Sequence, residues 1–554
     1  MLSAVLGTLL FGPLAARADP WIDTAFGQIH GHAKTPSAGG PSCEEFSGIP
    51  FAEPPARFQS PVPWTKPFSG GKFEASSFGS PCLQVETTTG NLRLLGSEDC
   101  LYLNVWRPAN LSGHTRLAVM LWIHGGAFRE GASESPESPF TVFYDGCRMA
   151  ARQDVIVVSL NYRLSIFGFG TFARSADGYD ANWGFKDQRE GMRWVQNHIA
   201  AFGGDRELLT IFGESAGAMS IFHHLASPLS AGLFRAAIMQ SGFPQAVSSA
   251  YGVHRTAKVA SAVGCSGASL RECLLSSNSS ALALAAAENC MDVFAQEEWG
   301  AVVDGEELDD YPDRIIRRGD SAAVPTLSGY DSNEANLFVY MEFTTAINTT
   351  QEKEYLKRVF VVDRDPRATL TEKELEEVMD VYNSKYADPD ARVPLSALLG
   401  DYTFICGTLT NGVLQSTRAP AYVYRFDQRP DCPQARHSIP GVYHSIELPY
   451  VFGNPPPTQW PIACEFSPLE QALSNAMQER WASFAKTLLP EGRQASSSLA
   501  WPAFTNQTRQ MMLFKEPHLL VEELPASKLN TCSWLYSFQN PEIDGTQRAT
   551  VIAV

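Results

Sequence analysis

The chain has 554 residues, of which 44% are hydrophobic and 19% charged, and its formal net charge at pH 7 is −17. This composition is that of a globular protein with a large core, and the acidic excess argues against nucleic acid or anionic membranes as partners, because both bind basic patches. No C-x-x-C pair or His/Cys cluster has the spacing of a zinc site, so we expect neither a metal nor a cofactor.

The N-terminal segment has the pattern of a signal peptide. An apolar run over Leu2–Ala15, too short to span a bilayer, precedes Ala16-Arg17-Ala18, a small-x-small sequence of the kind that signal peptidase cleaves. We therefore predict a signal peptide over 1–18, a mature domain over 19–554, and secretion without a membrane anchor. Secretion also fits eleven cysteines, an odd number that leaves at least one unpaired within the chain, and the sequons at Asn110, Asn278, Asn348 and Asn506.

Further along, Leu117–Ile123 is apolar enough for a central strand, and it leads into His124-Gly125-Gly126. Two adjacent glycines after such a strand let backbone N–H groups approach a ligand closely, as an oxyanion hole requires, although a plain turn has the same pattern. Another strand is predicted at 155–160 and an amphipathic helix over 182–205. This alternation predicts an α/β fold, a large, mostly parallel central sheet with helices on both faces and ligands at the carboxyl ends of its strands.

The stretch 208–225, LLTIFGESAGAMSIFHHL, places Ser215 between a buried strand and a helix. The turn 213–217 fits G-x-S-x-G, in which small neighbours allow a strained turn that exposes the serine hydroxyl. By itself the pattern also fits a glycine-rich turn whose serine caps a helix. Its combination with Gly125 and Gly126 is more specific, because hydrolases with such an elbow take an oxyanion donor from an upstream HGG loop.

A serine nucleophile needs a histidine base that a carboxylate orients, and in hydrolases with this elbow the chain order is serine, acid, histidine. The histidines beyond the elbow helix are His254, His437, His444 and His518. His444 is the best candidate because it lies in a glycine-led loop, GVYHSIELPY, that runs into an apolar segment. His254 leaves little room for an acid, and the other two lie in polar or surface-like sequence. For the acid, Asp331 and Glu334 both follow a predicted strand at 324–329, and spacing does not separate them.

Several segments carry a family resemblance, in this order: FSGIPFAEPP, EDCLYLNVWRP, WIHGGAF, SLNYRLSIFGF, FGGDRELLTIFGESAGA, IMQSGF, VVDGEEL, GYDSNEANLF and GVYHSIELPYVFG. They are similar to the type-B carboxylesterase family, which includes acetylcholinesterase, bile-salt-activated lipase and several fungal lipases. The resemblance covers nearly the whole mature chain. It implies a single α/β-hydrolase domain and a secreted, fungal-type carboxylesterase that hydrolyses a small-molecule carboxylic ester through an acyl-enzyme.

The resemblance also implies roles for individual residues. The nucleophile falls on Ser215, the base on His444 and the acid on Glu334. Asn333 and Ala335 flank that glutamate where the family usually has Asp and Gly, so Asp331 stays as the alternative acid. The implied oxyanion donors are the backbone N–H groups of Gly125, Gly126 and Ala216.

Disulfides and structural ion pairs are implied in the same way. The implied disulfides are Cys82–Cys100, Cys265–Cys273 and Cys406–Cys532, and the implied ion pairs are Arg57–Glu98 and Arg163–Asp187. No pairing is implied for Cys43, Cys147, Cys290, Cys432 and Cys464.

Two other functions compete with general ester hydrolysis. A binding or adhesion protein of the cholinesterase type lacks a working triad, whereas this chain has every member of one. An esterase, lipase or thioesterase devoted to one natural product or lipid would differ only in its pocket, for which the candidate walls are Phe128, Phe243, Phe294, Trp299 and Phe338. The predicted polar loop 83–99 has no aromatic residue to bind a choline cation and no long apolar lid, which favours soluble or moderately sized esters. The sequence does not indicate an oligomeric state.

Overall fold

The computed structural model describes residues 19–36, 40–88, 91–109, 111, 116–135, 144–174, 178–288, 294, 299–361, 365, 369–431, 439–455, 465–492, 499–517 and 519–539. The predicted signal peptide 1–18 lies outside these residues, as do Asn110, Cys290, Cys432, His437, Cys464 and His518. Within the described ranges, eleven strands form one large sheet in the order β20-β19-β18-β17-β14-β13-β9-β10-β8-β4-β3.

The centre of this sheet is parallel. The parallel strands are β10 (Ile156–Leu160), β9 (Leu117–Ile123), β13 (Gly204–Glu214), β14 (Ala236–Gln240), β17 (Thr326–Asp331), β18 (Ala421–Phe426) and β19 (Gln510–Phe514). Antiparallel pairing joins β8 (Tyr102–Pro108), β4 (Cys43–Pro50) and β3 (His32–Lys34) at one edge and β20 (Leu520–Glu523) at the other. The central strands are buried on both faces, which explains their nearly continuous apolar sequence, and the predicted mostly parallel sheet is confirmed.

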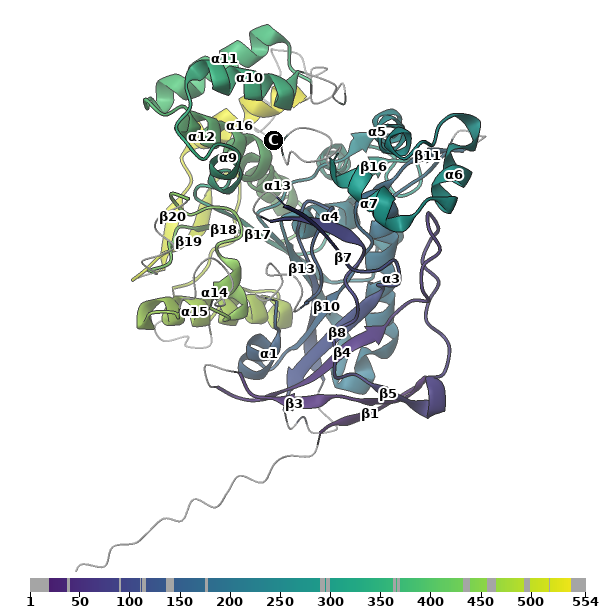
Figure 1. Cartoon of the computed structure of the whole chain (residues 1–554). Coiled ribbons are helices and arrows are strands. Elements are labelled where there is room, and N and C mark those ends of the chain that lie inside the picture. The colour runs from purple at the N-terminus through teal and green to yellow at the C-terminus, as the bar shows by residue number, and fades with distance from the viewer. Residues whose placement is uncertain are drawn as a thin grey trace, which may run out of the picture.

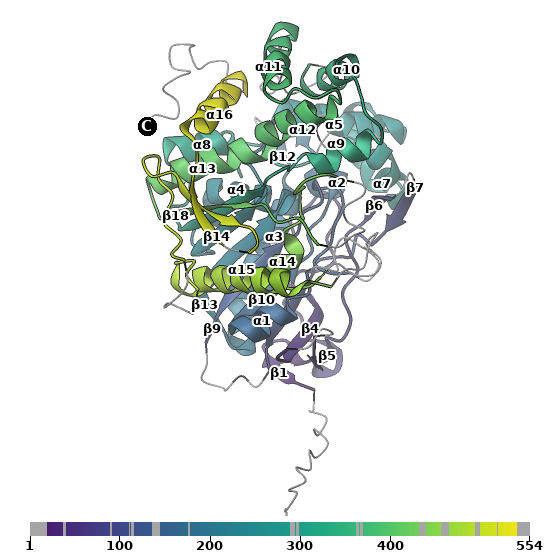
Figure 2. The same ribbon diagram turned by 90° about the vertical axis from the view of Figure 1, so that its left-hand side faces the viewer.

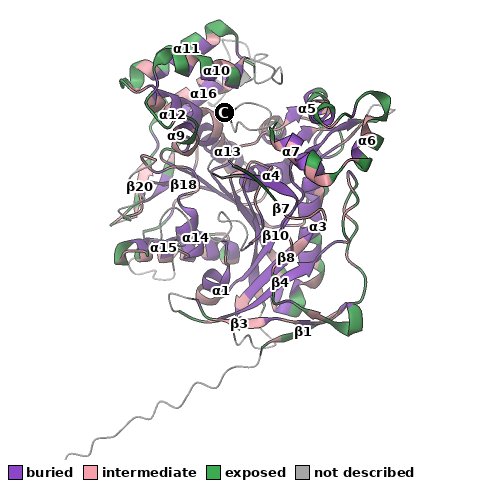
Figure 3. Ribbon diagram, viewed as in Figure 1, coloured by how far each residue is buried: buried purple, intermediate pink, exposed green. Residues whose placement is uncertain are grey.

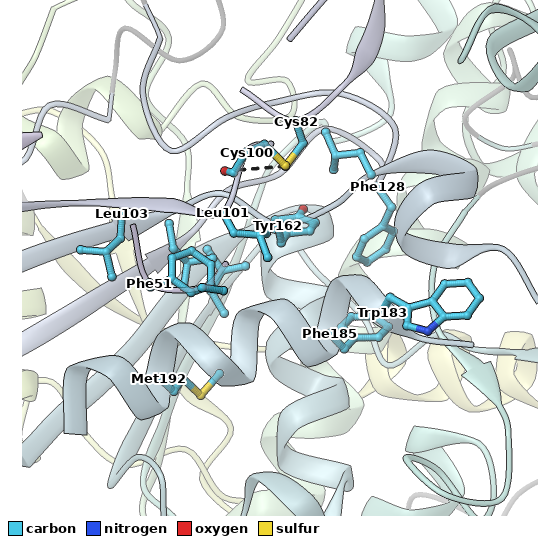
Figure 4. Packing of buried hydrophobic residues seen from close by; sticks show 14 of the residues in the cluster. Phe51, Cys82, Cys100, Leu101, Leu103, Phe128, Tyr162, Trp183, Phe185 and Met192 are labelled. Carbon is cyan, nitrogen blue, oxygen red and sulfur yellow. Dashed lines mark hydrogen bonds between the residues drawn. A yellow bond between two sulfur atoms is a disulfide. The ribbon is translucent and has the colours of Figure 1, made fainter. Parts of the chain in front are cut away.

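Helices cover both faces of the sheet (Figures 1 and 2). One face carries α1 (Cys147–Gln153), α14 (Leu448–Phe452) and α15 (Pro468–Thr487), and the other carries α3 (Trp183–His198), α4 (Ala216–Ala226) and α13 (Cys406–Ser416). In Figure 3 the strands and the sheet-facing sides of these helices are buried, whereas exposed residues gather on outlying helices such as α6 (Leu270–Ser276) and α11 (Glu372–Lys385). The aromatic core between α3 and the sheet includes Phe128, Tyr162 and Phe185 (Figure 4).

Smaller elements surround the sheet. The short strands are β1 (Trp21–Thr24), β2 (Gly27–His30), β5 (Lys72–Glu74), β6 (Gln84–Thr88), β7 (Asn91–Leu95), β11 (Phe172–Ala173), β12 (Tyr179–Asp180), β15 (Val247–Ser248) and β16 (Val302–Val303). The remaining helices are α2 (Ser165–Phe169), α5 (Ser249–Ala262), α7 (Ser279–Glu288), α8 (Pro312–Arg318), α9 (Asn336–Glu342), α10 (Thr349–Phe360), α12 (Arg392–Gly400) and α16 (Ala526–Gln539). A π-helical turn, Asp401–Ile405, joins α12 to α13.

Three sequence expectations need correction. The helix expected over 182–205 ends at His198, and after a 3₁₀ turn β13 begins at Gly204. The loop 83–99, expected to be a polar loop, forms the β6–β7 hairpin, in which Val85 and Leu95 are buried and anchor the hairpin to the body. The strand expected at 324–329 starts and ends two residues later, so Asp331 is the last residue of β17 and not part of the following loop. This difference bears on the choice of the acid, because it fixes the direction of the Asp331 side chain within the sheet.

Four disulfides are present among the described residues, two that close short loops and two that join segments more than 100 residues apart. The three implied pairs, Cys82–Cys100, Cys265–Cys273 and Cys406–Cys532, form, and a fourth bond connects Cys43 to Cys147 across 104 residues. The implied ion pairs also form, with closest N–O distances of 2.5 Å for Arg57–Glu98 and 2.7 Å for Arg163–Asp187. None of the described helices is long and apolar enough to cross a membrane.

Candidate active site

The serine predicted as nucleophile sits on a strained turn between β13 and α4. Ser215 has φ 54° and ψ −124°, a backbone conformation that side-chain-bearing residues rarely adopt and that costs on the order of 1–3 kcal/mol. The flanking glycines make the turn possible: a Cβ on Gly217 would lie 2.0 Å from the carbonyl oxygen of Ile123, and one on Gly213 would lie 2.6 Å from the same atom. The two glycines of G-E-S-A-G are therefore a steric requirement of this turn.

The expected base and one of the two candidate acids lie in contact. Nδ1 of His444 is 2.7 Å from Oε2 of Glu334, and the backbone N–H of His444 donates to the Glu334 carbonyl at 3.2 Å. The other carboxylate oxygen of Glu334 accepts the backbone N–H of Asp331 at 2.8 Å. Glu334, not Asp331, is thus the carboxylate in contact with the imidazole.

Glu214, the residue before Ser215, faces the opposite nitrogen of the imidazole. Its Oε1 lies 3.1 Å from Nε2 of His444 and accepts a 2.5 Å hydrogen bond from the hydroxyl of Ser445. Burial raises the pKa of Glu214 to about 8, against the lowering effect of His444. Burial would lower the pKa of His444, but the Glu214 and Glu334 carboxylates outweigh it and raise that pKa to about 9. Sequence reasoning missed Glu214 and Ser445, although both stand next to predicted residues.

The glycine loop after β9 lies against the serine turn. A Cβ on Gly125 would be 3.1 Å from the Cβ of Ser215, and Gly126 has φ 102°, which is left-handed backbone that favours glycine. His124 supports the loop: its ring stacks on Tyr162 at 4.3 Å, and the Tyr162 hydroxyl donates to its carbonyl oxygen. Burial lowers the pKa of His124 to about 4, so this imidazole is neutral.

The third implied oxyanion donor opens a helix. Ala216 is the first residue of α4, so its N–H points out of the helix end and takes no partner within the helix. This end also carries the positive pole of the helix dipole, which favours a negative charge. The three N–H groups therefore belong to two neighbouring strand ends, those of β9 and β13.

Aromatic rings line one side of the imidazole. The ring centroids of Phe404 and Phe338 lie 4.5 and 5.1 Å from that of His444. Phe243 and Phe294 extend the group, each packing edge-on against one of those two rings. Of the other rings proposed as pocket walls, Phe128 and Trp299 are buried in the core between α3 and the sheet. The sequence did not predict Phe404 as a pocket residue, because Phe404 lies in the π-helical turn and such a turn has no recognisable sequence pattern.

The remaining predicted sites lie elsewhere. His254 lies on α5, and the sequon residues Asn278 and Asn348 are exposed, whereas Asn506 is half-buried. Asn348 also caps α10 through a capping box with Gln351. In the part of the chain that the structure describes, no group of three or more His, Cys, Asp or Glu side chains is arranged to hold a metal ion.

Comparisons with known proteins identify the family of the chain. Residues 18–531 match the model of the Carboxylesterase family. The chain is 31% identical over 527 residues to the para-nitrobenzyl esterase of Bacillus subtilis, which covers 92% of this chain and 97% of that protein. It is 32% identical over 558 residues to the pyrethroid hydrolase Ces2e of Rattus norvegicus, which covers 96% and 92%. It is 31% identical over 546 residues to the cocaine esterase of Homo sapiens, which covers 90% and 89%.

A solved structure of a PNB esterase superimposes with a TM-score of 0.75 at 30% identity, covering 93% of this chain and 100% of that one. The sheet, its helices and this likeness define an α/β-hydrolase. The chain belongs to the carboxylesterase family, and it is a carboxylic ester hydrolase.

Proposed function

We propose that the chain hydrolyses carboxylic esters through an acyl-enzyme, with Ser215 as nucleophile, His444 as general base and Glu334 as the acid that orients it. The observation that carries this proposal is the 2.7 Å contact between Nδ1 of His444 and Glu334, with Nε2 on the other side of the ring 3.1 Å from Glu214, the residue before Ser215. An imidazole held in this way presents a basic nitrogen to a hydroxyl.

In the first half-reaction the Ser215 oxygen attacks the ester carbonyl while Nε2 of His444 takes its proton. Glu334 stabilises the imidazolium that forms, and His444 then returns the proton to the departing alcohol. In the second half-reaction a water molecule attacks the acyl-enzyme, with His444 again as the base. The first half-reaction ends with a neutral imidazole and an acylated Ser215, and the second restores the free serine hydroxyl.

The N–H groups of Gly125, Gly126 and Ala216 would bind the oxyanion of each tetrahedral intermediate. The close approach of Gly125 to Ser215 and the opening of α4 at Ala216 support this role. Loss of one such donor typically raises the barrier by roughly 3 kcal/mol. A Cβ at Gly125 would lie 2.8 Å from Oε2 of Glu214 in the serine turn, and one at Gly126 would lie 2.0 Å from the carbonyl oxygen of Glu130, so side chains at either position would displace the loop.

The substrate that we propose is a neutral ester with an apolar group. Four phenylalanine rings near His444 support this choice, because they offer apolar contact and no charge to pair with an ionic substrate. The relatives include proteins named for the hydrolysis of pyrethroids and of cocaine, and one named for para-nitrobenzyl esters. A binding or adhesion role has no observation in its favour.

We also propose that the enzyme is a secreted glycoprotein with one catalytic domain after residue 18. Four disulfides fit an oxidising compartment, and the exposed Asn278 and Asn348 are accessible to glycosylation. Mass spectrometry of the protein from culture medium would identify the N-terminus and the modified asparagines.

The hydrolysis of a series of nitrophenyl esters, from acetate to palmitate, tests the proposed reaction. Wild-type protein should release nitrophenol with an optimum at one acyl length, and Ser215→Ala should abolish turnover. A Ser215→Ala variant that keeps full activity would disprove the triad. The position of the optimum separates an esterase from a lipase.

A further inference from the structure

A second pair of carboxyl groups lies behind the proposed triad. Asp331 ends β17, three residues before Glu334, and Glu447 lies three residues after His444. The two carboxyl groups are within hydrogen-bond reach of each other, and both residues are fully buried. The chain segments that meet through Glu334 and His444 therefore meet a second time through Asp331 and Glu447.

We propose that Asp331 and Glu447 share one proton in a carboxyl–carboxyl hydrogen bond, and that this link makes Asp331 a positioning residue for Glu334 and His444. The inference rests on the proposed function only for the roles of the two positioned residues. The shared proton itself follows from the arrangement of the buried groups.

The hydrogen bonds around Glu447 show which of its oxygens takes part. The indole N–H of Trp481 is only a donor, and it donates to Oε1 of Gln240 at 2.9 Å. The amide of Gln240 must then turn its NH₂ group to Oε1 of Glu447, which it reaches at 2.9 Å. Oε2 of Glu447 and both side-chain oxygens of Asp331 receive no hydrogen bond from any donor among the described residues. A proton between these oxygens is the donor that they lack.

Among the described residues, no cation belongs to the groups that act most strongly on Asp331. The charged groups that act on it are the carboxyls of Glu447, Glu334 and Glu214, and each of them raises its pKa, as does burial. Tyr424, on β18, and Tyr443, in the loop that carries His444, are titratable groups on which the charge of Asp331 also acts, and it raises the pKa of each phenol. Burial raises the pKa of Glu447, whereas the charge of His444 lowers it. Two buried carboxyls in contact cannot both ionise at low cost, so the pair keeps one proton at neutral pH.

The link acts on the triad through the backbone of Asp331. The N–H of Asp331 donates to Oε1 of Glu334 at 2.8 Å, so the residue holds Glu334 through its main chain while its side chain holds the loop that follows His444. Loss of the shared proton would set two negative charges against each other and push the loop away from β17. A small displacement of a catalytic group is enough to slow a reaction about 100-fold.

The pair has a defined effect on stability. Because the folded state raises the pKa of Asp331 above its unfolded value, the folded protein holds a proton that the unfolded chain releases. Stability is therefore full below the ordinary aspartate pKa and falls as the pH rises toward the raised value. The substitution Asp331→Asn removes this dependence, since an amide donates to Glu447 at every pH.

The experiment compares wild type, Asp331→Asn, Asp331→Ala and the exposed control Asp380→Asn. Thermal unfolding of each protein is measured from pH 5 to pH 10, and kcat and KM for nitrophenyl acetate are measured at neutral pH. We expect the melting temperature of wild type and Asp380→Asn to fall toward alkaline pH more steeply than that of Asp331→Asn. We expect Asp331→Asn to keep a kcat at least about ten times that of Asp331→Ala, with KM changed much less than kcat.

If the melting temperatures of wild type and Asp331→Asn depend equally on pH, the proposal that Asp331 and Glu447 share a proton is wrong. An equal loss of kcat in Asp331→Asn and Asp331→Ala would overturn the positioning role. If Asp331→Ala does not fold, the melting curves of wild type and Asp331→Asn still test whether the proton is shared. Because that readout needs no turnover, it also distinguishes failure of this proposal from failure of the proposed triad, which Ser215→Ala tests.

Discussion

The hydroxyl of Ser445 donates a 2.5 Å hydrogen bond to Oε1 of Glu214. This bond joins the residue after His444 to the residue before Ser215, so the loop that carries the proposed base and the turn that carries the proposed nucleophile are connected directly. Ser445 has φ 70°, an uncommon backbone conformation for a residue with a side chain. The strained backbone of both loops is thus tied together at the point where base and nucleophile must meet.

Replacement of Glu334 by Gln should lower kcat by roughly 10³- to 10⁴-fold with little change in fold. An amide keeps the shape of the side chain, but it does not stabilise the imidazolium and it favours the wrong tautomer of His444. Steady-state kinetics with nitrophenyl acetate measure the loss, and a thermal melt serves as the control for folding. A variant within tenfold of wild type would show that another carboxylate orients the base.

The pH dependence of kcat/KM should show a base with an unusually high pKa. Burial lowers the pKa of His444, but Glu214 and Glu334 raise it to about 9, and only the neutral imidazole accepts the serine proton. We therefore expect kcat/KM to rise with pH through the neutral range and to level off above about 9. Since Glu214 and His444 are in contact, the apparent pKa of this rise describes the titration of the pair and not of either residue alone.

The substitution Glu214→Gln should move the rise of kcat/KM to lower pH, by roughly one to three pH units, because it removes the negative charge next to Nε2 of His444. Profiles between pH 6 and pH 10 measure the shift, with Glu377→Gln on the exposed face of α11 as the matched control. If kcat/KM rises at the same pH in Glu214→Gln as in wild type, Glu214 carries no charge during turnover.

Gly217→Ala should cost both activity and stability. Its Cβ would lie 2.0 Å from the carbonyl oxygen of Ile123, a backbone atom that cannot move without displacing β9 or α4. Such overpacking typically destabilises by roughly 1–3 kcal/mol or more. Gly400→Ala is the control, since its Cβ would meet no atom nearer than 3.6 Å and it lies in α12, where alanine is favoured by about 1 kcal/mol. Melting temperatures should therefore move in opposite directions.

Loss of the Cys43–Cys147 bond should destabilise more than loss of the Cys265–Cys273 bond. The first closes a loop of 104 residues and the second a loop of 8, for which the chain-entropy account gives roughly 5 and 2.5 kcal/mol. Paired Cys→Ser variants, compared by their denaturant midpoints under oxidising conditions, test the order. A larger effect of the short loop would show that native-state strain, and not loop length, decides the outcome.

The sequence predicted the parts of the site that depend on local chemistry. The elbow around Ser215 and the Gly125-Gly126 loop are recognisable because backbone geometry dictates their residue types. His444 followed from chain order and its setting. Glu334 and Asp331 could not be separated, because three residues of spacing do not tell where a strand ends, and the structure shows β17 continuing to Asp331.

Features that depend on tertiary packing were not predictable. Cys43 pairs with Cys147 because β4 and α1 pack beside the same strand, β8, and that neighbourhood has no signature in the sequence. Phe404 reaches His444 through an extra residue in a helical turn, which no periodicity reveals. The hydrogen bond from Ser445 to Glu214 likewise joins positions 231 residues apart.

Ser215 and Glu334 follow β13 and β17, which have β14 between them, so the two residues are held apart by two strand spacings, about 9–10 Å. In the proposed mechanism the chain must complete all three strands and then supply His444 before it can hydrolyse an ester. We therefore expect a nascent or truncated product that ends before His444 to contain Ser215 but to be inactive. Recovery of turnover during refolding would consequently report the closure of the sheet, not the formation of any single segment.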